Sequence, residues 1–253
     1  MNTLGKAQGI SVSPSRIFFK GEPGQTVTHP ITFSNQSSST FTFVTRIMDW
    51  DRDSLGVKIY YPAGTKQSSN AAWLNLSDPS LNLAPGETKQ VNLTMTIPNK
   101  NRSDSLSNSM LFFTQLKNRR DSISEGLGIN ILLEMGIQVY HIPAGLSPGE
   151  LDIVDFQDKG QINIQKKSVR QLAVKIKNSG SLNRDGNIRF ELTNIQTGEE
   201  IPVQSIALAM LPFSQQWVIF NLPSDLKGRY LAVAILEGGQ QYDLKVAEKE
   251  ITY

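Results

Sequence analysis

The sequence predicts an all-β protein built from two antiparallel β-sandwich domains that a short linker joins. Runs rich in β-branched and aromatic residues recur about every eight to twelve residues, and Gly, Pro, Asn and Asp stand between them. No window of about a dozen residues shows the 3.6-residue period of an amphipathic helix. At 253 residues the chain is long enough for one large domain or two ordinary ones.

The first domain is expected to span residues 10–143, after a disordered or tag-like extension at residues 1–9. Clusters of Gly and Pro at residues 21–24 and 84–87 predict turns between strands. Short strands separated by such turns are typical of an antiparallel sandwich. The expected strands are residues 10–20, 26–34, 40–50, 57–61, 72–76, 89–97 and 108–116.

The last strand of this domain, residues 127–141, is unusually long. Strict alternation of apolar residues over its whole length predicts a β-strand with one buried face. Such a strand would span roughly 50 Å, whereas an ordinary strand is about 17 to 20 Å long. Part of its apolar row is therefore expected at the domain's margin, where it either joins a partner strand or aggregates. A central strand of a stable sandwich is the plainer alternative. The apolar row is Leu127, Ile129, Ile131, Leu133, Met135, Ile137 and Val139.

A Pro- and Gly-rich segment marks the expected domain boundary, with residues 144–149 as the linker. Beyond it the pattern of strands and turns restarts, which predicts a second, smaller β-sandwich at residues 150–253. Its expected strands are residues 151–156, 161–165, 171–178, 186–195, 203–211, 216–222, 229–236 and 242–251.

Charge and hydropathy exclude several classes of protein. The net charge of +2, from 25 basic and 23 acidic residues, gives no electrostatic reason to expect nucleic-acid binding. No apolar run approaches the roughly 20 residues that a membrane-spanning helix needs. The first residues lack the apolar core of a signal peptide, so the sequence is either cytosolic or a mature form without its leader.

Few residues of the sequence could support catalysis or bind a metal. The chain has no Cys, and its two histidines, His29 and His141, stand far apart without a serine or acid pattern around them. Residues 49–53 alternate acids as a calcium loop does, but Ser54 and Tyr60 stand where such a loop needs Gly and Glu. A polar turn between strands is the preferred interpretation there. We therefore expect no enzyme activity, no metal and no cofactor.

Four stretches of the first domain together resemble one family. They are Val-Ser-Pro-Ser-Arg-Ile-Phe-Phe at residues 12–19 with Gly21 after it, Leu-Ala-Pro-Gly-Glu-Thr at 83–88, Ser-Met-Leu-Phe-Phe at 109–113, and the alternating strand of 131–143. Their order and spacing are similar to those of the periplasmic PapD-like chaperones that assemble pili by the chaperone/usher route. The resemblance implies two immunoglobulin-like sandwiches with a cleft between them. The second domain resembles the family only in its type, a smaller all-β domain.

The resemblance also implies a function for the long strand. In such chaperones this strand inserts alternate apolar side chains into the groove of a fibre subunit that lacks its own last strand. Backbone hydrogen bonds then give affinity, and pockets for alternate side chains set the register. By position the inserted side chains would be Leu127, Ile129, Ile131 and Leu133.

A carboxylate anchor is the second implied site. The family holds the subunit's terminal carboxylate with an Arg from the first strand and a Lys from the long strand. Arg16 matches the Arg position, whereas Gln138 occupies the Lys position. An amide donates a hydrogen bond without charge, and hydrogen bonds to ions are about twice as strong as neutral ones. Three options stay open: Arg16 carries most of the anchoring, another cation such as Lys20 assists, or the ligand is not a carboxylate.

The sequence as a whole predicts a periplasmic chaperone that caps pilus or fimbrial subunits by lending them a strand and hands them to an outer-membrane usher. Its expected partners are the subunit and the usher, and the same edge is a candidate for self-association. The rival hypothesis is an envelope or surface adhesion module, in which the two domains are spacers or bind a ligand such as a glycan.

Overall fold

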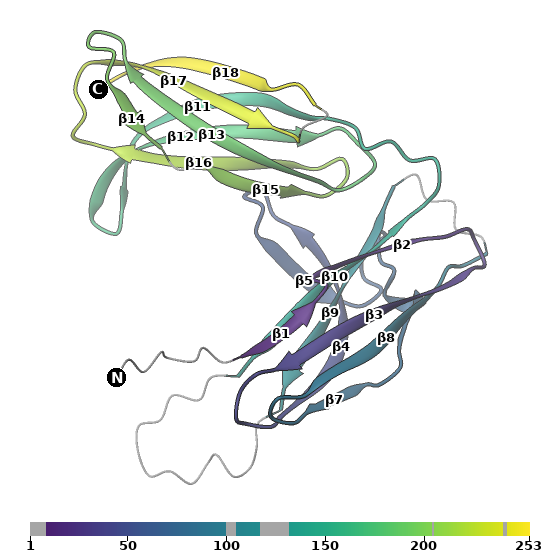
Figure 1. Cartoon of the computed structure of the whole chain (residues 1–253). Coiled ribbons are helices and arrows are strands. Elements are labelled where there is room, and N and C mark those ends of the chain that lie inside the picture. The colour runs from purple at the N-terminus through teal and green to yellow at the C-terminus, as the bar shows by residue number, and fades with distance from the viewer. Residues whose placement is uncertain (1–8, 100–104, 117–131, 204, 240–241) are drawn as a thin grey trace. The chain divides into compact units, whose positions relative to one another are not determined.

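The computed structural model describes residues 9–99, 105–116, 132–203, 205–239 and 242–253. Within these ranges the prediction of an all-β fold is confirmed, because the chain forms strands in four sheets and one short 3₁₀ turn. The chain divides into two compact units, one of residues 1–50 and 60–144 and the other of residues 51–59 and 145–253. Figure 1 labels most of their strands. Within the described ranges, no helix has the length and apolar character needed to cross a membrane.

The first unit pairs a sheet in the order β1-β3-β8-β6 with a second in the order β2-β10-β9-β4-β5, to which β7 adds beside β4. Their elements are β1 (Ile10–Ser13), β2 (Arg16–Lys20), β3 (Thr26–Asn35), β4 (Phe41–Arg52), β5 (Lys58–Pro62), the 3₁₀ turn η1 (Ala71–Trp73), β6 (Leu74–Leu76), β7 (Ser80–Leu83), β8 (Thr88–Thr96), β9 (Ser107–Gln115) and β10 (Glu134–Ile142).

The core of this unit lies between its two sheets. Along β8, Val91, Leu93 and Met95 are buried, as their alternation in the sequence predicts. The rings of Phe33 in β3 and Phe113 in β9 meet across the sandwich with centroids 4.5 Å apart. Contacts of this kind between opposed apolar faces hold the two sheets together.

The first predicted strand, residues 10–20, is in fact two strands in different sheets. β1 pairs with β3, and β2 pairs with β10 in the other sheet, so the chain changes sheets between Ser13 and Arg16. The change occurs at Pro14, which has no backbone N–H and cannot continue a ladder of hydrogen bonds. The alternation of side chains does not reveal this break, because both pieces keep the same period.

The preference for a polar turn at residues 49–53 was wrong. β4 continues through Arg52, and Asp49 is fully buried within it. The Asp49 carboxylate accepts hydrogen bonds from the backbone N–H of Lys66 at 2.8 Å and from the Ser69 hydroxyl at 2.5 Å. These bonds satisfy polar oxygens that would be costly to bury unpaired, so an acid is tolerated inside the strand. The strand β7 was not predicted.

The second unit contains a three-stranded sheet in the order β11-β12-β16 and a five-stranded sheet in the order β14-β13-β17-β18, in which β15 also pairs with β13. Its core includes Phe190, whose ring stacks on that of Phe220 at 4.7 Å. The strands are β11 (Leu151–Ile164), β12 (Lys167–Asn178), β13 (Arg184–Asn194), β14 (Glu200–Pro202), β15 (Ile206–Met210), β16 (Gln215–Pro223), β17 (Arg229–Glu237) and β18 (Lys245–Thr252).

Two details of the second unit differ from the prediction. The expected strands at residues 151–156 and 161–165 form one long strand, β11, with register shifts at Ile153/Asp155 and Asp158/Gly160. Gly160 has a φ of +71°, which a glycine adopts without strain and which suits a bulge. The break expected between two strands is therefore a bulge within one continuous strand. The short strand β14 was also not predicted.

Candidate functional site

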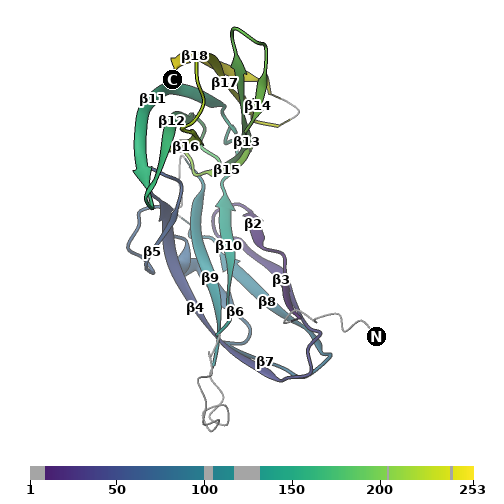
Figure 2. The ribbon, with the colours of Figure 1, turned by 90° about the vertical axis from the view of Figure 1, so that its left-hand side faces the viewer.

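Among the described residues, strand β10 has a neighbour on both sides over only part of its length. It pairs antiparallel with β9 from Glu134 to His141, but parallel with β2 only from Gln138 onward. Figure 2 shows β10 between these two strands. Among the described residues, no strand pairs with the other edge of β10 between Glu134 and Ile137. Unpaired backbone groups of this kind are a template for strand addition.

The register shows which backbone groups face the open edge. The N–H of Gln115 in β9 donates to the carbonyl of Leu133 at 2.8 Å, so odd-numbered residues of β10 point their backbone groups toward β9. The N–H of Gln138 donates instead to Ser15 on the β2 side, at 3.1 Å. Glu134 and Gly136 have the same parity as Gln138. Their N–H and C=O groups therefore face the open edge.

The side chains beside this edge divide between the two faces of the sheet. Leu133 and Met135 are partly buried against the core, and Ile137 is fully buried. On the other face, the Glu134 carboxylate accepts hydrogen bonds from the Thr114 hydroxyl at 2.5 Å and from Arg46 at 3.2 Å. The open edge thus has an apolar inner side and a charged, hydrogen-bonded outer side.

The two residues predicted for the carboxylate anchor lie side by side. Arg16 and Gln138 are direct partners in the parallel register of β2 and β10. Arg16 is half-buried, and Gln138 is buried with 9% of its surface exposed. Lys20 pairs with Ile142, so its backbone lies four residues, or about 13 Å, further along β2. The structure therefore brings Arg16 and Gln138 together and places Lys20 away from them.

Of the four predicted donor residues, Leu133 is the one within the described ranges. Leu127, Ile129 and Ile131 lie outside the described residues. Leu133 is described, half-buried and packed against the core, and the strand proper begins at Glu134. The part of the long alternating row that is described, from Leu133 to Val139, contributes to the protein's own core.

Sequence reasoning missed one residue near the anchor, Tyr140. Its hydroxyl donates a hydrogen bond to the side-chain oxygen of Gln138 at 2.6 Å, and the ring is 2% exposed. The signal was present in the sequence, because residues two apart on a strand share a face. It was not used because a tyrosine on an alternating strand is most simply a packing residue.

Neither histidine forms part of a catalytic arrangement in the described structure. His141 is buried in β10, with its ring 5.5 Å from that of Trp73. Burial lowers the pKa of His141, and a backbone contact with Gly21 acts weakly in the opposite direction. His29 packs edge-on against Phe19 at 4.8 Å. In the part of the chain that the structure describes, no three His, Asp or Glu side chains are grouped as metal ligands would be.

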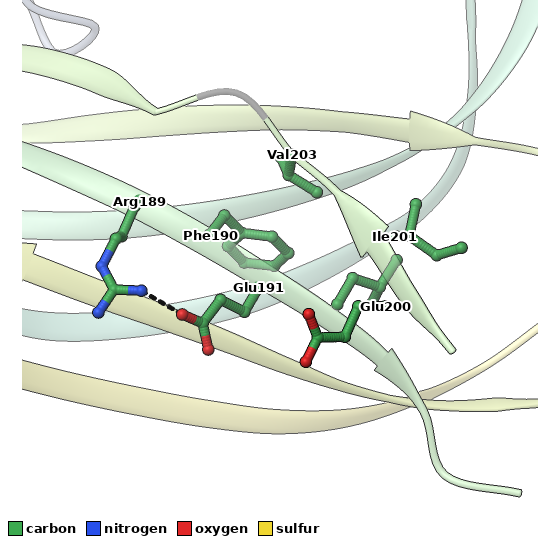
Figure 3. Close-up of a pocket in the computed structure, with 7 residues that line it drawn as sticks. Arg189, Phe190, Glu191, Glu200, Ile201 and Val203 are labelled. Atoms are coloured by element: carbon green, nitrogen blue, oxygen red, sulfur yellow. Dashed lines mark hydrogen bonds and ion pairs between the residues drawn. The ribbon is translucent and has the colours of Figure 1, made fainter. Parts of the chain in front are cut away.

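A pocket of about 350 Å³ lies along β13 and β14 of the second unit (Figure 3). Arg189 forms ion pairs with Glu191 and with Glu237, the latter at 3.0 Å, so its charge is already balanced. The remaining wall is mostly apolar, and the lining contains no nucleophile beside a general base. The lining residues are Arg189, Phe190, Glu191, Leu192, Glu200, Ile201 and Val203.

The sequence matches no protein-family model and no curated protein. Many solved structures with a similar fold are chaperones of fimbriae and pili, and they match nearly the whole chain. The YadV chaperone is 12% identical over 96% of this chain and 99% of that chain, with a TM-score of 0.50. The complex of CsuC with the tip adhesion subunit CsuE, from the archaic chaperone-usher Csu pili of Acinetobacter baumannii, gives 13% identity, 94% and 97% coverage, and a TM-score of 0.49.

The E. coli chaperone DraB is 14% identical over 97% of this chain and 98% of that chain, with a TM-score of 0.48. The match to YadV shows that the two-sandwich fold expected from the sequence is the fold of this class of chaperone. At such low identity the comparison shows the fold alone.

Proposed function

We propose that this protein is a periplasmic chaperone of the chaperone/usher type, which caps subunits of a pilus or fimbria by adding its own strand to them. The observation that carries the proposal is the half-paired strand β10, whose N-terminal part has backbone groups without a neighbouring strand among the described residues. The fold shared with a chaperone of known structure supports the same function.

The open edge suits an extended partner. The N–H and C=O groups of Glu134 and Gly136 can form a ladder with an incoming strand, which gives affinity without regard to sequence. Specificity then comes from alternate side chains, and a slip of one residue would exchange an apolar face for a polar one. We assign the inserted side chains to Leu127, Ile129, Ile131 and Leu133, which continue the alternation of β10 toward the N-terminus.

The end of β2 sets where the partner strand stops. β2 begins at Arg16, opposite Gln138, so a strand added along the open edge would lie in line with β2 and end beside these two residues. A partner strand running parallel to β10 would present its C-terminal carboxylate there. Arg16 then supplies a charged donor and Gln138 a neutral one. We assign these two residues to the anchor for the partner's terminal carboxylate.

The remaining parts of the proposal follow from this role. Strand addition involves no covalent step, so the protein is proposed to bind subunits without catalysis and without a cofactor. Its partners would be the subunit and the outer-membrane usher that receives it, and its location the periplasm. An open β edge also pairs readily with a second copy, so self-association in the absence of subunit is part of the proposal.

The pocket along β13 and β14 is the one observation that favours the alternative, an adhesion module that binds a ligand. Its ion-paired arginine and apolar wall contain no arrangement that selects a particular ligand. Glycan binding would be expected to depend on this pocket and to be insensitive to changes at the β10 edge.

The proposed function predicts that Ile131→Asp abolishes strand capture while the fold survives. A charged side chain in an apolar groove costs several kcal/mol, so affinity should fall by about 100-fold or more. The probe is a pilus subunit that lacks its own last strand and so has the apolar groove, and its binding is measured by calorimetry. Thermal melting followed by circular dichroism checks the fold.

Leu132→Asp is the matched control, because Leu132 is exposed and has the opposite parity. It should bind the subunit like the unmodified protein. Equal binding by both variants would contradict strand donation, and equal loss in both would indicate a general effect of charge near the edge.

A further inference from the structure

The hydrogen bond between Tyr140 and Gln138 sets the direction of the Gln138 amide. The Tyr140 hydroxyl donates to the side-chain oxygen of Gln138 at 2.6 Å in a buried contact. The amide oxygen is thus held toward Tyr140, and the amide nitrogen with its two N–H donors points away from that hydroxyl. Among the described residues nothing accepts a hydrogen bond from this nitrogen, and it is not one of the atoms sealed away from solvent.

The Tyr140 ring is held on two sides. It stacks on Phe18 of β2, with centroids 5.0 Å apart and planes at 11°, and it meets Trp50 of β4 edge-on at 6.1 Å. Trp50 is itself fixed, because its indole N–H donates to the carbonyl of Ser109 at 3.1 Å and its own carbonyl accepts from Asn108 at 3.0 Å. The hydroxyl of Tyr140 therefore has little freedom to move away from Gln138.

The position of Gln138 decides what its nitrogen would meet. Gln138 pairs directly with Arg16, which also carries only hydrogen-bond donors on its side chain. A neutral amide that could turn freely would present either its oxygen or its nitrogen at this place. An amide whose oxygen is held by the Tyr140 hydroxyl directs its nitrogen away from that hydroxyl, so Arg16 and Gln138 can both direct donors to the same place.

We propose that Tyr140 is a positioning residue that turns Gln138 into a fixed hydrogen-bond donor, so that Arg16 and Gln138 together select a carboxylate. The inference rests on the proposed function, since it concerns the place where the partner strand ends. It explains how the site works with an amide where a lysine is expected: orientation of a neutral donor replaces part of what a second charge would supply. The partner chemistry that fits is an extended peptide with a free C-terminal carboxylate. A peptide with an amidated C-terminus would bring N–H groups toward donors and should bind less well.

The test compares two peptides of alternating valine and threonine that differ only at the C-terminus, one a free carboxylate and the other an amide. The measured quantity is the ratio of their affinities. Tyr140→Phe keeps the ring and its contacts and removes only the hydroxyl. We expect the unmodified protein to prefer the carboxylate and the variant to lose about 5- to 10-fold of this preference, the usual size for one hydrogen bond.

Gln138→Ala completes a double-mutant cycle, because the proposal has Tyr140 acting through Gln138. Gln138→Ala should reduce the preference as well, and adding Tyr140→Phe to it should change the ratio no further. Tyr61→Phe is the control, since it also removes a tyrosine hydroxyl from the first unit and lies beside Lys66 instead. It should leave the ratio unchanged.

Each other outcome overturns the inference in a distinguishable way. A carboxylate preference that survives Tyr140→Phe, or an equal loss for both peptides, would remove the positioning role and leave the proposed function standing. Equal affinity of the unmodified protein for both peptides would remove the carboxylate selection and leave strand capture standing. Failure of the unmodified protein to bind either peptide would overturn this inference together with the proposed function.

Discussion

At the scale of single residues, the candidate anchor is built from three side chains on two adjacent strands. Arg16 and Gln138 were named from the sequence, and the parallel register of β2 and β10 makes them direct neighbours. Tyr140 was not named, although its hydroxyl holds the Gln138 oxygen. The difference has a physical cause: a resemblance supplies positions, whereas the orientation of an amide depends on contacts that only the folded chain makes.

Arg16→Ala should weaken capture of the carboxylate peptide by about 10- to 100-fold, the range for losing a hydrogen bond to a charged group. The loss should be much smaller for the amidated peptide, and calorimetry on both measures the difference. Lys20→Ala is the matched control, because Lys20 lies on the same strand but is exposed and about 13 Å away. Equal effects of the two substitutions would remove Arg16 from the anchor.

His141 makes the stability of the protein depend on pH. Burial lowers its pKa in the folded protein below the 6.5 of an unperturbed histidine. The unfolded chain therefore binds the proton more readily, so the contribution to stability is complete above pH 6.5 and is lost as pH falls below it. Urea unfolding between pH 7.5 and 5 should show this loss, and His141→Phe should reduce it. An unchanged pH dependence in His141→Phe would contradict the assignment.

At the scale of elements, hydrophobic alternation predicted where strands lie better than how they are joined. It found the buried row of β8 and the described part of β10, because burial on one face imposes a period of two. It merged β1 with β2, because a change of sheet at Pro14 leaves the period of two nearly intact. It divided β11, because a bulge at Gly160 resembles a turn between two strands. These features depend on which neighbour a strand pairs with.

The strands of the second unit are also joined by a charged pair. Asp158 in β11 binds Arg170 in β12, and Arg170 also donates to the carbonyl of Thr252 in β18, which belongs to the other sheet. The hydrogen bond from Arg170 is the main reason that the pKa of Asp158 lies below its usual value. This contact links both sheets at one edge of the sandwich.

Asp158→Asn should lower the free energy of unfolding by about 2 kcal/mol at pH 7, because one partner of a partly buried ion pair is lost. A lowered carboxyl pKa means that the contribution is present above the unfolded pKa of about 3.9 and disappears as pH falls through the folded value. The difference between the two proteins should therefore shrink at pH 3. Glu248→Gln, at an exposed position of β18, controls for the loss of a charge. A constant difference across pH would contradict the role of the charged pair.

At the scale of the whole molecule, composition and pattern by themselves determined the fold class. The chain has enough apolar residues for real cores, no helical period, and turn residues at intervals that suit sandwiches, and these properties depend only on local sequence. Tertiary structure alone decided that, among the described residues, β10 has a neighbour on both sides only from Gln138 onward, that Arg16 pairs with Gln138, and that the Tyr140 hydroxyl binds the Gln138 oxygen. These features arise from contacts between segments more than a hundred residues apart, or between side chains whose directions are set by packing. A local sequence period therefore does not predict them.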